Sequence, residues 1–110
     1  GGGGGGSIES PAWRVTDLPP GFRNVAHKRE AMPPRGEAVQ HSVYTDGLAS
    51  VSVFIEPLGE QDDMPLKGAS RMGAVHAYGM MDNDHQITVV GEVPGATVKR
   101  IARSVERVRE

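Results

Sequence analysis

Residues 41–55 read HSVYTDGLASVSVFI, and this stretch decides the fold class. Within it, Val51, Val53 and Ile55 alternate with Ser50 and Ser52, which is typical of a strand with one buried face. Residues 38–44 are expected to form a second strand, and the Asp-Gly pair between the two segments is a strong β-hairpin signal. The centre of the chain is therefore expected to be antiparallel sheet.

The apolar pattern bears on the length of this hairpin loop. A two-residue loop would place Val43 opposite Ser50, whereas a three-residue loop over residues 45–47 would place Val43 opposite Ala49. The longer loop gathers small and β-branched residues on one face. It also puts Gly47 at a left-handed backbone position, where glycine costs least. We predict the three-residue loop.

Outside this hairpin, the sequence predicts three more strands, over residues 22–29, 72–80 and 86–93. The acidic turn at residues 82–84 is expected to join the last two as another hairpin. Residues 57–70 are polar and rich in glycine and proline, and we expect a long loop there, either mobile or functional.

The N-terminal part contains two kinds of segment. Residues 1–7 are six glycines and a serine, which we interpret as an artificial linker, so that the folded domain covers residues 8–110. Prolines prevent a helix over residues 8–21, and a turn is expected at Pro20-Gly21. Trp13 is the only tryptophan and is expected to anchor this segment to the core, although ligand stacking is an alternative.

The C-terminal part changes from strand to helical periodicity. A helix is expected to begin between Pro94 and Thr97. Its apolar stripe would be formed by Val98, Ile101, Ala102, Val105 and Val108. One apolar helix face and one apolar sheet face most simply cover each other. The expected class is α+β, with an antiparallel sheet of about five strands packed against one C-terminal helix.

Composition excludes several classes of function. The chain has 110 residues and a formal net charge of −2, so one small domain is expected and nucleic acid is not an expected partner. No apolar run reaches the roughly 18–20 residues of a transmembrane segment. The absence of cysteine excludes disulfides and thiolate metal sites within these residues, but leaves the compartment open.

The side chains that could support chemistry do not form a catalytic or metal-binding pattern. His27, His41, His76 and His85 show neither an HExxH pattern nor i, i+4 spacing, so we expect ordinary histidines, no metal and no cofactor. Counted from Asp82, a calcium loop would need glycine at the sixth position and glutamate at the twelfth, where Ile87 and Val93 stand.

Catalysis and phosphate binding are also disfavoured. The strand serines lack a glycine elbow, and the acidic residues Glu60, Asp62 and Asp63 lie in the long loop, so we expect no enzyme. The basic residues near the C-terminus could contact phosphates or anionic lipids, but such side chains are more often solvated. They are Lys99, Arg100, Arg103 and Arg107.

Several segments, in this order, resemble the C-terminal domain of the MucB/RseB family. The resemblance covers nearly everything from residue 8 onward. The strings that carry it are WRV (13–15), LPPGF (18–22), HSVYTDGLASVSVFI (41–55), TVVGEVP (88–94) and TVKRIA (97–102).

This resemblance implies a periplasmic protein of Gram-negative bacteria, with a larger N-terminal domain before the present one. It implies binding to the periplasmic region of a membrane anti-sigma factor of the MucA/RseA type, which is thereby protected from regulated proteolysis. An extracytoplasmic-stress sigma factor would then stay silent. In the family, lipid or lipopolysaccharide relieves the inhibition. A lipid- or envelope-binding domain without anti-sigma recognition is the alternative, and the oligomeric state, a homo-oligomer included, stays open.

We place the partner contact on the hairpin of residues 39–55 and on the loop of residues 57–71, because these combine sheet backbone, aromatic anchors and adaptable side chains. A role of the two aromatic residues in the core is the competing interpretation. The predicted contact residues are Tyr44, Phe54, Met64, Leu66 and Arg71.

Overall fold

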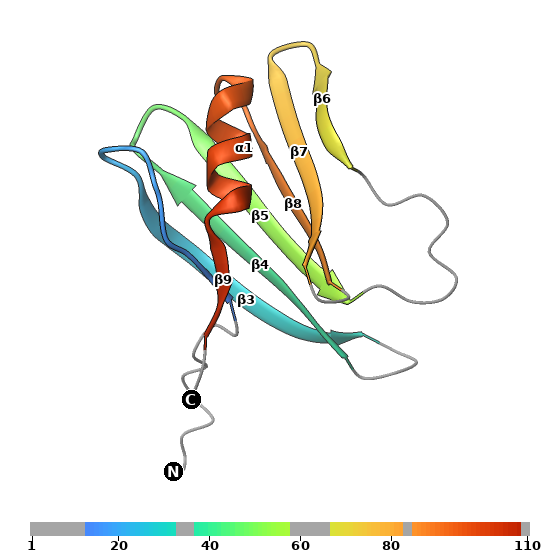
Figure 1. Cartoon of the computed structure of the whole chain (residues 1–110). Helices are drawn as coiled ribbons and strands as arrows, with labels where there is room; N and C mark the ends of the chain where they lie inside the picture. The colour runs from blue at the N-terminus through green and yellow to red at the C-terminus, as the bar shows by residue number, and fades with distance from the viewer. Residues whose placement is uncertain (1–12, 33–36, 58–66, 83–84, 109–110) are drawn as a thin grey trace.

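The structure is a computed structural model that describes residues 13–32, 37–57, 67–82 and 85–108 (Figure 1). Its elements are β2 (Trp13–Val15), β3 (Arg23–Met32), β4 (Glu37–Thr45), β5 (Ser50–Pro57), β6 (Gly68–Met72), β7 (Val75–Asp82), β8 (His85–Gly91), α1 (Gly95–Arg103) and β9 (Val105–Arg107).

Six of these strands form one antiparallel sheet in the order β3-β4-β5-β8-β7-β6, and β2 pairs with β9 in a separate two-stranded sheet. The α+β class is therefore confirmed, but the count of about five strands was too low. The additional strands are short: β2 and β9 have three residues each, and β6 has five. Strand β6 was not predicted because its residues, GASRM, are mostly exposed and therefore show no alternation of apolar and polar side chains.

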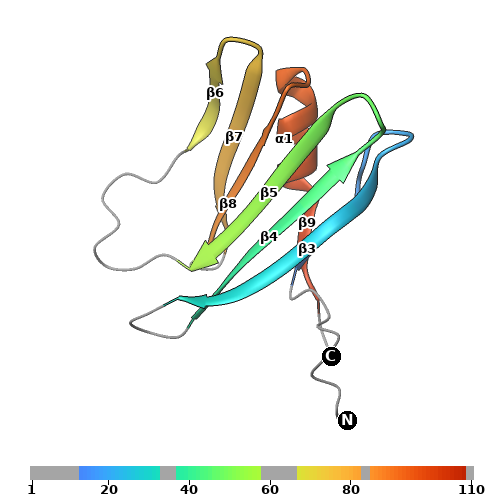
Figure 2. The same cartoon turned by 180° about the vertical axis from the view of Figure 1, so that it is seen from behind.

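The six-stranded sheet has one covered face and one open face. Val51, Val53 and Ile55 of β5 point to the covered face, where they meet the buried Ile87 and Val89 of β8. The helix and the β2–β9 pair lie over this face, whereas in the view from behind no described helix or strand lies over the other face (Figure 2). The hydrophobic core lies between the covered face and these elements.

The loop of the β4–β5 hairpin was predicted wrongly. Thr45 pairs with Ser50, so the loop has four residues, 46–49, instead of three. The carboxylate of Asp46 holds the loop by accepting hydrogen bonds from the N–H groups of Leu48 and Ala49, at 2.8 and 2.9 Å. Gly47 does adopt the expected left-handed conformation, with φ of 97°.

Together, the longer loop and its later position in the chain (46–49 instead of 45–47) turn β4 over relative to the prediction. Val43 pairs with Ser52 instead of Ala49, a shift of three residues, and an odd shift exchanges the two faces of a strand. Counting apolar matches gave the wrong register, because the buried residues of β4 include the polar Gln40 and Ser42 as well as Tyr44.

The helix begins at Gly95, within the expected interval, but ends at Arg103, well before the expected C-terminus. Ser104 donates from its hydroxyl to the Ile101 carbonyl, at 2.8 Å, and closes the last turn. Val105 is buried as expected, but in β9, where it pairs with Val15. Val105 and Val108 are three residues apart, which fits a helical period, but so short a pattern does not require a helix. Here residues 105–107 pair with β2 and form a strand instead.

The remaining predicted boundaries are partly confirmed. The Pro20-Gly21 turn is present: the Phe22 N–H donates to the Pro19 carbonyl at 3.2 Å, and Gly21 has φ of 86°. The segment expected as a strand from residue 72 divides into β6 and β7 around Gly73, whose φ is 62°. The long loop is shorter than expected at its C-terminal end, since β6 starts at Gly68. Residues 58–66 and the turn residues 83–84 lie outside the described part, as does the predicted linker.

The helix α1 packs mainly on β7 and β8. Among the described residues, no helix has the length and apolar character needed to cross a membrane.

Candidate functional site

Strand β2 lies over the covered face of the sheet and is held there by one buried glutamine. The Trp13 N–H donates to Oε1 of Gln40 at 3.2 Å, and Nε2 of Gln40 donates to the Trp13 carbonyl at 2.9 Å. Both residues are 4% exposed. The Gln40 side chain therefore satisfies both peptide groups of Trp13, as a neighbouring strand would.

The two edges of β2 differ. The inner edge pairs with β9, and just beyond it the Thr16 N–H donates to the Ser104 carbonyl at 3.1 Å. Alternate residues of an antiparallel strand turn their peptide groups to opposite edges. The peptide groups of Trp13 and Val15 therefore face the outer edge, away from β9, in agreement with the Gln40 contacts.

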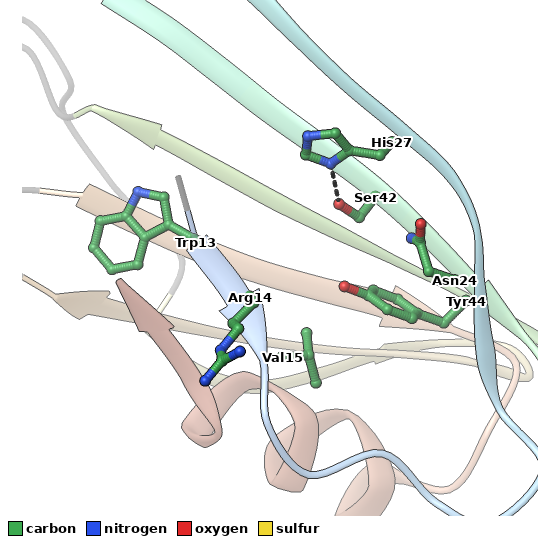
Figure 3. A pocket seen from close by; sticks show the side chains of 7 residues that line it. All are labelled: Trp13, Arg14, Val15, Asn24, His27, Ser42 and Tyr44. Atoms are coloured by element: carbon green, nitrogen blue, oxygen red, sulfur yellow. Dashed lines mark hydrogen bonds between the residues drawn. The ribbon is translucent and has the colours of Figure 1, made fainter. Parts of the chain in front are cut away.

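A cleft of about 370 Å³ lies beside β2 (Figure 3). One wall comes from β2 and the other from side chains of β3 and β4, and Val15 of β2 approaches Tyr44 across it. The lining residues are Trp13, Arg14, Val15, Asn24, His27, Ser42 and Tyr44.

The polar groups of the β3–β4 wall are largely fixed by hydrogen bonds. Nδ1 of His27 lies 3.0 Å from the Ser42 hydroxyl. The amide of Asn24 donates to the carbonyls of Ala26 and Val43, at 2.9 and 3.2 Å. Within the described residues, the buried Nε2 of His27 has no hydrogen-bond partner. Most polar groups of this wall are thus already paired, and Nε2 of His27 is left without a partner.

Tyr44 forms the apolar end of this wall. Burial raises the pKa of its phenol above the ordinary value, while a hydrogen bond with Ser42 acts in the opposite direction. The phenol is therefore neutral at physiological pH and can take part in hydrogen bonds without carrying charge.

Trp13 contacts two further side chains. The centroid of its ring system lies 5.0 Å from that of His85, and Cζ of Arg107 lies 5.7 Å from the centroid, within cation–π range. The expected anchoring of the N-terminal segment by Trp13 is confirmed, because this residue belongs to the buried core.

The structure does not bring the predicted contact residues together. Tyr44 is buried and lines the cleft on the covered face. Phe54 points to the open face, where its ring stacks on His41 with a centroid distance of 4.2 Å. Arg71 is exposed on β6, opposite His76 of β7. Met64 and Leu66 lie outside the described residues. Tyr44 and Phe54 therefore cannot form one pair of anchors.

The histidines are also dispersed. His27 and His76 lie on the covered face of the sheet, and His41 lies on the open face. Among the described residues, no three histidine or acidic side chains lie close enough to hold a metal ion.

The basic side chains of the C-terminal part do not form one patch. Arg100 forms a bidentate ion pair with Asp17, at 2.7 and 2.8 Å, and this contact lowers the pKa of the Asp17 carboxyl. Arg107 belongs to β9 and lies over Trp13.

Sequence reasoning missed the four polar lining residues Arg14, Asn24, His27 and Ser42, as well as Val15, as partners in one site. One signal was present: Gln40, Ser42 and Tyr44 alternate along β4, so polar groups point to the same face as a buried aromatic ring. The correct register was needed to see that this face is the covered one.

Comparisons with known proteins agree with this fold. The family model described as the MucB/RseB C-terminal domain matches residues 7–106. The chain is 38% identical over 98 residues to the sigma factor AlgU regulatory protein MucB of Pseudomonas aeruginosa, and this match covers 86% of the chain. The same match covers 30% of that protein, so the chain corresponds to less than a third of its length.

Solved structures give the same result. The complex structure of Pseudomonas aeruginosa MucA/MucB contains a chain that matches 94% of this one with a TM-score of 0.74 and 34% identity, over 37% of its own length. A crystal structure of MucB in complex with MucA(peri) matches with a TM-score of 0.72, 34% identity and the same coverage of this chain, over 39% of its own length. On the family model and these relatives together, the chain belongs to the MucB/RseB C-terminal domain family.

Proposed function

We propose that this domain binds the periplasmic region of a membrane anti-sigma factor of the MucA/RseA type. The observation that carries the proposal is the likeness, at 34% identity, to MucB chains solved together with MucA. Binding of this kind belongs to the periplasm, and that is the compartment we propose for the protein.

The structure offers a surface suited to a polypeptide. A cleft with fixed polar groups lies beside the short strand β2, and such strand edges bind extended chains through their backbone groups. We propose a binding role without catalysis, in which the domain recognises its partner by shape and hydrogen bonding.

Binding of this kind would also protect the anti-sigma factor from proteolysis. A partner segment held on a folded domain is less accessible to a protease, which requires an extended and free chain. We propose that the protein containing this domain protects the anti-sigma factor from cleavage in this way, and so keeps the envelope-stress sigma factor inactive.

Isothermal titration calorimetry with the purified chain and the periplasmic region of Pseudomonas aeruginosa MucA tests the proposal. Saturable binding with a stoichiometry near one domain per partner is the expected result. A parallel titration with lipopolysaccharide micelles distinguishes the lipid-binding alternative. Heat from lipopolysaccharide, with none from MucA, would overturn anti-sigma recognition in favour of envelope binding.

A further inference from the structure

The outer edge of β2 carries one peptide group that is already paired and one that is not. Trp13 uses its N–H and carbonyl with Gln40. Val15 turns its N–H and carbonyl to the same edge, and in the part of the chain that the structure describes neither has a hydrogen-bond partner. Because peptide groups are rarely left unpaired beside buried structure, this edge is incomplete.

The unpaired position opens on the cleft. In Figure 3, β2 passes along one side of the cleft, with Val15 near Tyr44 and with His27 and Ser42 on the facing wall. Nε2 of His27, also on that wall, is the buried polar atom that lacks a partner. The cleft is therefore bordered by the unpaired peptide group of Val15, and a buried ring nitrogen of one lining residue also lacks a partner.

We propose that the cleft binds an extended segment of the partner chain, which pairs with the peptide group of Val15 as an added strand. This inference rests on the proposed function and assigns it a location. An N–H and a carbonyl of one residue, turned to the same edge, match the pair of groups that a residue of an antiparallel strand presents. The segment passes between β2 and the Ser42–His27 wall.

The Gln40 contacts explain why the site would take only a short segment. Gln40 occupies the outer edge at Trp13 and so blocks continuous pairing toward the N-terminal end of β2. At its other end β2 stops at Val15, since the strand has only the three residues Trp13–Val15. One residue of β2 is thus available, and the specificity must come from the lining side chains.

Hydrogen exchange followed by NMR tests this location without any substitution. The Val15 amide of the free ¹⁵N-labelled chain should exchange fast, and it should slow by at least about tenfold when the MucA periplasmic region is bound. The Arg14 amide, which faces β9, serves as the internal control and should change little.

A matched pair of variants provides a second test. Val15→Pro removes the N–H only from the outer edge, a position where an edge strand tolerates proline. Val15→Thr keeps both the N–H and the β-branched shape. The dissociation constant for MucA should rise about tenfold in the proline variant relative to the threonine variant, the loss expected for one hydrogen bond.

The outcomes separate the two proposals. Binding of MucA with unchanged exchange at Val15 would overturn the location of the site and leave the function standing. Absence of MucA binding altogether would overturn the function, and the site with it. If the proline variant fails to fold, the exchange measurement still decides.

Discussion

The two faces of the six-stranded sheet differ in what lies over them, and both the core and the cleft beside β2 lie on the covered face. On the covered face, β5 and β8 contribute valine and isoleucine side chains that are almost completely buried beneath α1 and the β2–β9 pair. On the open face, Phe54, His41 and Val43 are only partly exposed but have no described helix or strand over them. The covered face therefore holds the core, and the cleft lies where its cover ends.

The largest expected effect is in the centre of the covered face. Ile101 of α1 is fully buried, and Ile101→Ala leaves a cavity beneath the helix, so the free energy of unfolding should fall by about 2–5 kcal/mol. Urea denaturation followed by circular dichroism measures this. Leu48→Ala is the control, because Leu48 is 97% exposed and its truncation should change stability by less than about 0.5 kcal/mol. Equal effects of the two substitutions would contradict the assignment of the core.

The second effect concerns the attachment of β2 to the sheet. Gln40→Ala removes two hydrogen bonds and leaves both peptide groups of Trp13 unpaired in a buried position, which should cost about 2–3 kcal/mol. Trp13 fluorescence should shift to longer wavelength as its surroundings admit water. Ser52→Ala, on the open face of the neighbouring strand, is the control and should leave the emission unchanged. An unaltered spectrum for Gln40→Ala would show that β2 is held mainly by β9.

The third effect lies on the open face and should be smaller. Phe54→Ala loses the stacked contact with His41 and part of an apolar side chain, so a loss of about 1–2 kcal/mol is expected. Phe54→Leu keeps most of the apolar area and isolates the contribution of ring stacking. A loss from Phe54→Ala as large as that from Ile101→Ala would mean that the open face is covered after all.

The smallest effect is electrostatic and depends on pH. Hydrogen bonding to Arg100 holds the pKa of the Asp17 carboxyl below its ordinary value, so the folded state binds this proton less readily than the unfolded chain. The stabilisation is present above the unfolded pKa and is lost as the pH falls below about 4. Thermal melts from pH 7 to pH 3 should show a smaller loss of Tm for Asp17→Asn than for the parent chain.

The acid dependence will not vanish in that variant. The pKa of the Asp46 carboxyl is also lowered, because the carboxylate accepts N–H groups of the hairpin loop. Identical pH profiles for Asp17→Asn and the parent chain would show that the Arg100 contact, which is exposed to solvent, contributes nothing measurable.

Much of the covered face could be predicted from the sequence, because its buried residues recur there with the period of a strand or of a helix. The alternation of Val51, Val53 and Ile55 predicted β5, and the stripe of Val98, Ile101 and Ala102 predicted α1. The turn glycines at positions 21 and 47 were predicted from their chemistry and do adopt positive φ. These signals are local, and local signals depend little on the rest of the fold.

The site could not be predicted, because it depends on long-range pairing. Strand β2 exists only through β9, about ninety residues later in the chain, and three residues give no periodic signal. The polar wall of the cleft required the true register of β4, which is set by hydrogen bonds of Asp46 that the apolar pattern does not encode. For the same reason, the predicted register put Tyr44 and Phe54 on one face, whereas the true register puts them on opposite faces.

The most direct test compares the side chains of the two faces during binding. Chemical shifts of Val15 and Tyr44 in the cleft, and of Val43 and Phe54 on the open face, can be followed in one NMR titration with the MucA periplasmic region. We predict that the cleft signals move to saturation while the open-face signals stay near their free positions. Saturating shifts on the open face, with the cleft signals unmoved, would contradict the placement of recognition beside β2.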